Sequence, residues 1–350
     1  MKEAGRKMNN ICIENLNQVL AKYDTNLKQI AVKAGIKYTS LFSRVKKRRV
    51  TERDLEKISD ALEINLTDLK KQLKSARPVP FIKWVGGKTQ LLPEIEKHMP
   101  KNYGAYFEPF LGGGAVLLDL MPNRAVVNDL NSELINAYQM VMQKPDELIK
   151  QLTDLFNSDS KENYLAVRAV DRTGEILNYS TVQRAARFIY LNKAGYNGLW
   201  RVNQKGQNNV PYGQHKKLTV PINQIKADSN FLANSDVVFK TGDYQNCTAQ
   251  AKQGDFVYFD PPYVPVTPTA SFTSYTKNGF GLVQQKQLVE LARNLASQGV
   301  YVMLSNSDTK LTRQLYKDKC FHIHKVKARR SINRNGAKRG KVGEVLITTY

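Results

Sequence analysis

The chain has 350 residues, enough for one large domain and a second, small one. Its 53 Lys and Arg residues against 31 Asp and Glu give a formal net charge of +22, which indicates a polyanionic partner such as nucleic acid. No apolar run approaches the roughly 18 residues of a membrane span, and the three widely separated cysteines favour a reducing cytoplasm over a disulfide framework or a zinc site.

Residues 1–74 predict a small all-α domain. Residues 26–36 have a helical apolar pattern that closes with Gly35, and a second short helix follows from Tyr38 to Val45. A helix, a tight glycine turn and a second helix have the spacing of a helix-turn-helix unit, which binds DNA. A generic small helical bundle is the alternative for this segment.

The next helical stretches, 55–62 and 65–69, resemble the last two helices of Cro-repressor-type domains. Two residues depart from the pattern of that family. Glu63 stands where the family usually ends a helix with Gly, and Arg44 stands near an apolar position of its recognition helix. The resemblance implies a small DNA-binding domain, and the departures leave the detailed positions of its helices open.

Residues 75–80 contain two prolines and interrupt the helical pattern, which predicts a linker. From 81 to 350, short apolar strands alternate with helical segments, which is typical of an α/β fold. From about 131 to 215 the pattern is polar and helical, which indicates a DNA-recognition region inserted into that fold at about 131–240. The predicted strands lie at residues 106–107, 125–127, 237–239, 256–259, 300–304 and 345–349.

A glycine turn at residues 112–114 follows the first predicted strand and leads into an apolar helix. Glycines in such a turn let a ligand approach the backbone closely. The next strand ends at Asp129, whose carboxylate is placed to bind ribose hydroxyls. An NAD-dependent dehydrogenase uses the same arrangement, but Leu117 occupies the place of the third glycine of the dinucleotide pattern.

S-adenosylmethionine, which contains an adenosine but no phosphate, is the alternative ligand. It needs an acid for its ribose and a cation for the carboxylate of its methionine part. Residues 81–88, with the sequence FIKWVGGK, offer the cation from Lys88 and an aromatic wall from Trp84. These residues favour S-adenosylmethionine over NAD.

The sequence Asp260-Pro261-Pro262-Tyr263 follows the buried strand predicted at 256–259. It therefore lies at the carboxyl end of a strand, where open α/β sheets bind ligands. The prolines lack N–H donors, so this segment offers rigid carbonyl acceptors beside a carboxylate and an aromatic ring, without donors nearby. Such a site suits an NH₂ group on a planar base that stacks on the tyrosine. The residues thus predict methylation of an exocyclic amine.

Taken in chain order, these segments closely resemble the Dam-type adenine-N6 DNA methyltransferases (D12 class, alpha group). The resemblance runs from about residue 80 to 350 and includes FIKWVGGK, FEPFLGGG, VVNDLN and DPPY, together with residues 191–213. It implies a Rossmann-like sheet that uses S-adenosylmethionine to methylate adenine in double-stranded DNA, in the sequence GATC. The residues that it implies for the cofactor site are Trp84, Lys88, Phe110, Gly112, Asp129 and Asp260.

The resemblance also implies how residues 260–263 act. The N6 lone pair of adenine is delocalised into the ring, so the amine is a poor nucleophile. Acceptance of its N–H bonds by the Asp260 carboxylate and the Pro261 carbonyl would free that lone pair to attack the methyl group in line. Because N6 is paired in the duplex, the adenine must flip out, at a cost of a few kcal/mol. The sulfonium leaves as a neutral thioether, so we expect neither a metal nor a general acid.

A polar, glycine-bearing stretch within the inserted region resembles the base-reading hairpin of this family. Tyr196 is the expected wedge at the flipped site, and Asn197 and Arg201 are the expected readers of base edges. Leu199 and Pro211 offer apolar contact to thymine methyl groups.

Other functions stay open beside this one. Transfer to cytosine N4, to RNA or to a protein glutamine keeps the same chemistry, although Asp260 rather than an Asn before the prolines argues against it. A repressor that acts through residues 1–74 would not need the catalytic segments. Between 310 and 341, twelve Lys or Arg accompany one acid, Asp318, which favours phosphate contacts. A cognate restriction endonuclease is a possible partner.

Overall fold

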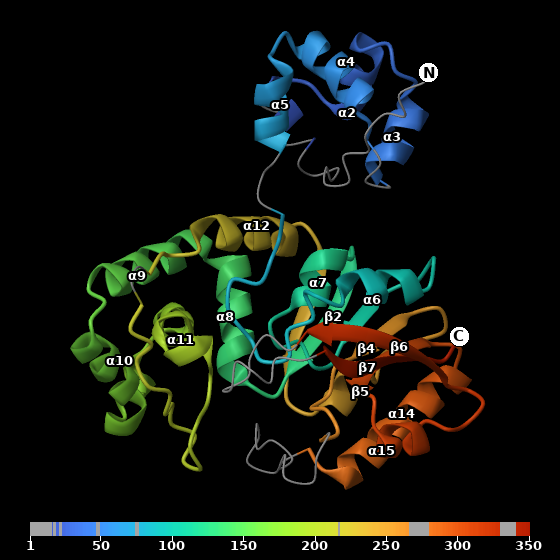
Figure 1. The fold of residues 1–350 in the computed structure, drawn as a ribbon. Coiled ribbons are helices and arrows are strands. Elements are labelled where there is room, and N and C mark those ends of the chain that lie inside the picture. The colour runs from blue at the N-terminus through green and yellow to red at the C-terminus, as the bar shows by residue number, and fades with distance from the viewer. Residues whose placement is uncertain are drawn as a thin grey trace. The chain divides into compact units, whose positions relative to one another are not determined.

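The protein is described from a computed structural model, which describes residues 16, 19–20, 23–46, 50–73, 77–215, 218–265, 280–329 and 341–350. The chain divides into two compact units, residues 1–77 and 78–350 (Figure 1). The buried hydrophobic side chains of each unit cluster separately from those of the other. Within the described ranges, no helix is both long and apolar enough to cross a membrane.

The first unit consists of short helices around a small apolar core. Their bounds are α2 (Leu27–Lys33), α3 (Tyr38–Lys46), α4 (Glu52–Leu62) and α5 (Leu66–Leu73). Asn26 and Thr51 cap two of them, because each side chain accepts a backbone N–H of the first turn while Gln29 or Asp54 bonds back to the cap. Gly35, between α2 and α3, has a φ of +61°, a conformation that favours glycine.

The two residues that depart from the Cro-type pattern have structural roles in this unit. Glu63 ends α4 in the left-handed conformation, with φ 59° and ψ 38°, at the position where a glycine is usual. Arg44 makes a bidentate ion pair with Asp54, with Nε 2.9 Å from Oδ2 and NH2 2.8 Å from Oδ1. The guanidinium therefore ties α3 to α4.

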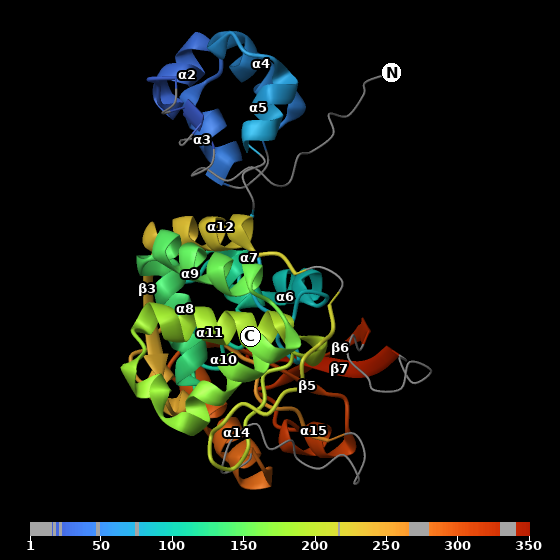
Figure 2. The ribbon, with the colours of Figure 1, turned by 90° about the vertical axis from the view of Figure 1, so that its left-hand side faces the viewer.

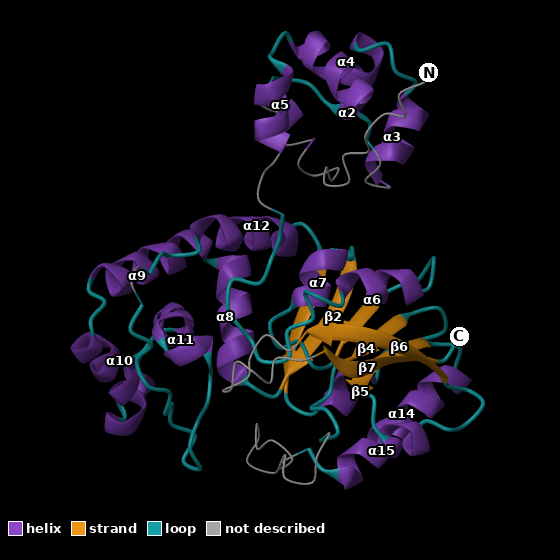
Figure 3. Cartoon of the chain, in the orientation of Figure 1, coloured by secondary structure: helices purple, strands orange, loops and turns teal. Residues whose placement is uncertain are grey.

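The described part of the second unit contains a seven-stranded sheet in the order β3-β2-β1-β4-β5-β7-β6. Figure 3 shows the strands of this sheet in orange, with helices around them. The strands are β1 (Tyr106–Glu108), β2 (Arg124–Asp129), β3 (Asp236–Thr241), β4 (Phe256–Phe259), β5 (Tyr301–Ser307), β6 (His322–Arg329) and β7 (Lys341–Thr348). The strands from β3 to β5 in this order pair in parallel, whereas β7 pairs antiparallel with β5 and β6. The predicted α/β class and all six predicted strands are confirmed.

Both faces of the sheet are covered, because successive side chains of a strand point to opposite faces. Tyr106 and Tyr258 belong to one buried cluster, while Phe107 and Val257 belong to the other. The helices that pack near these faces are α6 (Leu92–His98), α7 (Ala115–Leu120), α13 (Tyr244–Thr248), α14 (Leu282–Ser297) and α15 (Lys310–Leu315). The apolar runs that predicted the strands reflect this burial on both sides.

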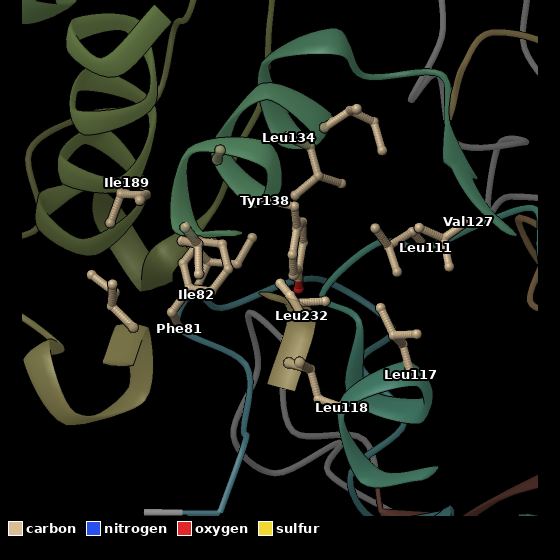
Figure 4. Close-up of a cluster of buried hydrophobic side chains, with 14 of the residues drawn as sticks. Phe81, Ile82, Leu111, Leu117, Leu118, Val127, Leu134, Tyr138, Ile189 and Leu232 are labelled. Atoms are coloured by element: carbon tan, nitrogen blue, oxygen red, sulfur yellow. The ribbon is translucent and has the colours of Figure 1, made fainter. Parts of the chain in front are cut away.

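The helices between β2 and β3 gather beside the sheet (Figures 1 and 2). They are α8 (Ser132–Gln143), α9 (Pro145–Asn157), α10 (Lys161–Thr173), η1 (Glu175–Asn178), α11 (Thr181–Ala194), η2 (Tyr196–Gly198) and α12 (Ile222–Ala233). Tyr138 of α8 packs edge-on against Phe81, with ring centroids 4.8 Å apart (Figure 4). Its hydroxyl donates to the carbonyl of Gly113 at 2.8 Å, so this helical region is bonded directly to the glycine turn.

Candidate active site

The segments that the sequence singles out meet where the order of the parallel strands reverses, between β1 and β4. The glycine turn follows β1, Asp129 ends β2, and Asp260 follows β4. Because these strands are parallel, their carboxyl ends share one edge of the sheet. Open α/β sheets bind ligands at such a reversal, and this edge is the candidate active site.

Trp84 packs directly over the glycine turn. A Cβ atom at Gly112 would lie 2.8 Å from Cδ1 of Trp84, and one at Gly113 would lie 3.0 Å from its Cβ. Gly112 also has a φ of +50°, so both its conformation and its neighbour require glycine. The Asp129 carboxylate accepts the backbone N–H of Gly112 through Oδ2 at 2.9 Å, and that of Asn131 through Oδ1 at 2.9 Å. Three of the predicted cofactor residues therefore lie together.

Phe110 provides an aromatic surface beside the same turn. Its ring stacks on Tyr244, the first residue of α13, with centroids 5.0 Å apart and an interplanar angle of 26°. It also meets Phe259 edge-on at 6.4 Å. Phe110 thus connects the ends of β3 and β4. Tyr244 was not among the predicted site residues, although the turn that precedes it follows a predicted strand.

The Asp260 carboxylate is held from two sides. Lys88 Nζ lies 2.7 Å from its Oδ2, and the Ser305 hydroxyl donates to its Oδ1 at 2.8 Å. Ser305 accepts in turn from the Tyr258 hydroxyl at 3.1 Å. The side chains of Lys88 and Asp260 are only 7% and 20% exposed, so each charge depends on the other for its neutralisation.

The turn that follows Asp260 is fixed by polar side chains of neighbouring elements. Gln285 of α14, which is fully buried, donates to the carbonyl of Pro262 at 2.8 Å. Asn306 of β5 accepts the N–H of Val264 at 3.0 Å and donates to Gln285 at 3.3 Å. The two proline residues therefore sit in a turn whose backbone is bonded to two other elements.

Tyr263 lies against the same ion pair. Lys88 Nζ is 4.9 Å from the centroid of its ring, and its hydroxyl donates to Glu344 of β7 at 3.1 Å. Burial raises the pKa of Tyr263, and the nearby charges of Asp260 and Glu344 raise it further, so the hydroxyl stays protonated. The expectation of acceptors without donors nearby is wrong at this site, because Lys88 and Ser305 both donate directly to Asp260.

Glu108, which was not among the predicted site residues, is buried at the end of β1 with 2% exposure. Its Oε2 accepts from the Tyr106 hydroxyl at 2.9 Å and from the backbone N–H of Leu117 at 3.1 Å. Burial raises the pKa of Glu108 to about 8; the bond from Tyr106 opposes this rise and the charge of Asp260 adds to it. The carboxyl group is therefore mostly protonated at neutral pH.

This raised pKa predicts a fold that loses stability as the pH rises. The folded state binds a proton at Glu108 that the unfolded chain releases above its ordinary pKa of 4.5, so the free energy of unfolding should fall between about pH 4.5 and pH 8. The slope from this one group reaches at most about 1.4 kcal/mol per pH unit. Glu108→Gln should remove that slope, as measured by urea unfolding from pH 5 to pH 9. Identical pH slopes in both proteins would contradict the assignment.

Residues 195–213 form a loop that closes on itself through two antiparallel bridges, between Gly195 and Tyr212 and between Val202 and Asn208. Of the residues predicted to contact DNA, Leu199 is half-buried and the others are exposed. The exposed ones are Tyr196, Asn197, Arg201 and Pro211.

This loop is attached to the segment that carries Trp84. The side chain of Asn192 donates to the carbonyls of Lys83 and Gly198, each at 2.9 Å, and accepts the N–H of Lys83 at 3.0 Å. Lys83 covers Gly198 so closely that a Cβ atom there would lie 2.5 Å from Cδ of the lysine. The side chain of Asn192 thus links the predicted DNA-contact loop to the residue before Trp84. Of the basic stretch from 310 to 341, residues 330–340 lie outside the described residues.

Comparison with known proteins places this arrangement among enzymes that modify DNA. A model of the family described as D12 class N6 adenine-specific DNA methyltransferase matches residues 84–332. The type II methyltransferase M1.LlaDCHI of Lactococcus lactis subsp. cremoris is 47% identical over 272 residues, which cover 77% of this chain and 95% of that protein.

Two further relatives come from distant organisms. The DNA adenine methylase of Escherichia coli (strain K12) is 40% identical over 270 residues, covering 76% of this chain and 93% of the relative. The type II methyltransferase M.MjaIII of Methanocaldococcus jannaschii is 40% identical over 290 residues, covering 77% of this chain and 99% of the relative. Each match therefore spans nearly the whole relative and leaves about a quarter of this chain uncovered.

Proposed function

This chain belongs to the D12 class of N6 adenine-specific DNA methyltransferases, which use S-adenosylmethionine, and we propose that its target is an adenine flipped out of double-stranded DNA in the sequence GATC. The observation that carries the proposed site is the Asp260 carboxylate, oriented by Lys88 and Ser305 where the strand order reverses. The sequence GATC rests on the resemblance of residues 191–213 to the Dam-type family.

In the proposed reaction, Asp260 and the Pro261 carbonyl accept the N–H bonds of the adenine amine. As the nitrogen takes the methyl group, it loses one of these protons to water through the Asp260 carboxylate. A carboxylate has about four acceptor positions, so Oδ2 can accept from the amine while it keeps its bond to Lys88. The Ser305 hydroxyl holds Oδ1 and thereby fixes the rotation of the carboxylate. Tyr263 offers the ring on which the flipped base stacks. Pro262, whose carbonyl is already bonded to Gln285, keeps the turn rigid.

The residues at the glycine turn fit S-adenosylmethionine. Each Asp129 oxygen accepts one backbone N–H and has a second lone pair for a ribose hydroxyl. Gly112 keeps the turn free of a side chain under Trp84, and Phe110 supplies an aromatic surface. Lys88, whose ammonium lies 2.7 Å from Asp260, supplies a positive charge at this edge of the sheet. When bound, S-adenosylmethionine supplies a methyl group on a sulfonium that leaves as a neutral thioether.

The loop of residues 195–213 is the proposed reader of the DNA sequence. Tyr196 serves as the wedge, while Asn197 and Arg201 contact base edges. Leu199 and Pro211 contact thymine methyl groups. Support comes from the exposure of four of these side chains and from Asn192, which links the loop to residue 83, next to the proposed cofactor residue Trp84.

Residues 1–74 form a second proposed DNA contact, of the helix-turn-helix type. The unit has its own core, and its segment of α2, Gly35 and α3 has the order of such a motif. This observation favours a second function beside methyl transfer, namely repressor-like binding to a separate DNA site. Because DNA is the substrate of the methyltransferase family and the proposed partner of the N-terminal unit, we also infer a cytoplasmic location.

Labelled S-adenosylmethionine and a panel of duplexes that differ at single base pairs test the main proposal. Label should enter N6 of adenine in GATC, and substitution of an outer G·C pair should raise the activation free energy of transfer by about 1–3 kcal/mol. Transfer should persist in EDTA, because the leaving group is neutral. Loss of transfer in EDTA would overturn the mechanism, and label in cytosine N4 or in RNA would overturn the substrate.

A further inference from the structure

One short stretch of the DNA-contact loop, residues 208–210, is bonded to helix α10. The Asp171 carboxylate accepts the N–H of Asn208 through Oδ2 at 2.8 Å, and Arg172 donates to the carbonyl of the same residue. The carbonyl of Val210 accepts from Arg168 NH1 at 2.8 Å. The backbone of this stretch is therefore held through both kinds of polar group. A carboxylate accepts its N–H at Asn208, and guanidinium groups donate to its carbonyls at Asn208 and Val210.

The helix is built to present these groups together. Asp171 and Arg172 follow Arg168 by three and four positions and Tyr164 by seven and eight, a spacing that places all of them on one side of α10. Tyr164, which is buried, adds a further bond from its hydroxyl to the Val210 carbonyl at 3.0 Å. One side of one helix thus carries the attachment of the loop.

Asp171 is itself held by a buried arginine of the neighbouring helix α11. Arg187 of α11, only 4% exposed, places NH2 2.9 Å from Oδ2 of Asp171. The same guanidinium donates to the carbonyls of Val167 and Arg168 at 2.9 and 3.0 Å. The carboxylate oxygen that holds the N–H of Asn208 therefore has a rigid partner in the protein interior.

The held stretch carries the proposed base reader. Arg201 donates through Nε to the side chain of Asn209 at 2.6 Å and through NH2 to its carbonyl at 3.2 Å. Asn209 lies between the two attached residues, Asn208 and Val210. Asn209 therefore bonds the Arg201 guanidinium to the backbone that α10 holds, and the guanidinium has further N–H donors for a base.

We propose that Asp171 is a positioning residue for sequence discrimination: it sets the orientation of Arg201 through the backbone of Asn208 and Asn209. The inference rests on the proposed reading of a base by Arg201. A bidentate contact with a base tolerates errors of only a fraction of an ångström and about 10–20°. Release of the Asn208 N–H lets the guanidinium sample orientations that no longer distinguish the correct base from the others.

Two substitutions of Asp171 separate this role from plain support of the fold. Asp171→Ala removes the acceptor for Asn208 together with the ion pairs to Arg187 and Arg172, whereas Asp171→Asn removes the charge but keeps an oxygen acceptor. Both should lower the thermal midpoint. Only Asp171→Ala should reduce the ratio of kcat/KM for the preferred duplex to that for single-pair variants, by about tenfold or more at one base pair.

The affected base pair is identified with Arg201→Ala. Asp171→Ala should reduce discrimination at the same base pair. The double variant, Asp171→Ala with Arg201→Ala, should discriminate no worse than Arg201→Ala alone, since both substitutions act through one contact. Affinity for S-adenosylmethionine should be unchanged in all of them. Glu133→Gln is the matched control, because it breaks the ion pair of Arg184 between α11 and α8 without touching the loop. It should keep full discrimination.

Several results would overturn the inference. Equal loss of discrimination in Asp171→Asn and Asp171→Ala would assign the effect to the ion pair, and a uniform fall of kcat/KM on every duplex would assign it to general support. If Asp171→Ala does not fold, Arg168→Ala tests the attachment at Val210 and should reduce discrimination at the same base pair by a smaller factor. Unchanged discrimination in Arg168→Ala would then refute the proposal. If Arg201→Ala lowers kcat/KM by the same factor on every duplex, Arg201 does not read a base, and the inference is wrong as well.

Discussion

Asp260→Ala is expected to lower the rate of methyl transfer at least about a hundredfold, the scale of losing one charged group that acts in the transition state. The carboxylate is the acceptor that we propose for the adenine amine, and Lys88 and Ser305 already hold it in one orientation. DNA affinity should change little, because this group faces the amine rather than the phosphates. Single-turnover transfer at saturating S-adenosylmethionine and DNA measures the chemical step separately from binding.

The substitution also leaves the Lys88 ammonium without its partner, which costs stability on the order of 3–5 kcal/mol. A second buried carboxylate near the same strand controls for that cost. Asp255, just before β4, is 3% exposed and accepts the N–H of Ala105 at 2.8 Å and that of Lys252 at 3.0 Å. Asp255→Ala should lose stability but keep the transfer rate of the folded protein. Near-normal transfer by Asp260→Ala would refute the catalytic assignment.

The sequence predicts local features of this site well. The run from Phe256 to Phe259 indicates a strand because each of its four side chains is buried, as β4 shows. The glycine turn can be predicted equally well, since Gly112 has a conformation and a neighbour that only glycine tolerates. Such signals depend on residues close in sequence, and they locate the carboxyl ends of β1, β2 and β4 without knowledge of the fold.

The partners of Asp260 could not be predicted in the same way. Ser305 is 45 positions away, and its approach depends on the register of β4 against β5. A usable signal was present, because polar residues follow the apolar run of β5 at the same edge of the sheet. Lys88 was predicted to serve the cofactor, yet its ammonium bonds Asp260, since the path of the chain before the sheet decides where it points. The protonated state of Glu108 arises from burial that no sequence pattern reveals.

Removal of the N-terminal unit is expected to weaken DNA binding strongly while methyl transfer survives at low salt. Residues 1–79 hold 18 Lys and Arg and 9 Asp and Glu, a net charge of +9. For every phosphate that the protein no longer neutralises, the slope of log K against log[salt] should become shallower by about 0.9. A truncated protein that begins at Ser75 should therefore bind DNA about tenfold or more weakly at 150 mM salt, with a shallower slope. Equilibrium binding at several salt concentrations measures both quantities.

A substitution on α3 tests whether this weakening comes from a specific surface of the unit. Tyr38 and Phe42 are each 38% exposed, with ring centroids 5.8 Å apart, whereas Leu41 on the same helix is buried in the core. If α3 is the helix that enters the major groove, Tyr38→Ala combined with Phe42→Ala in the full chain should lower the affinity for a preferred DNA site nearly as much as the truncation does. The slope of log K against log[salt] should stay that of the full chain, because no positive charge is removed. Loss of S-adenosylmethionine binding on truncation would show that the two units are not independent. A truncated protein that matches the full chain in affinity and salt slope on every DNA would show that the N-terminal unit does not bind DNA.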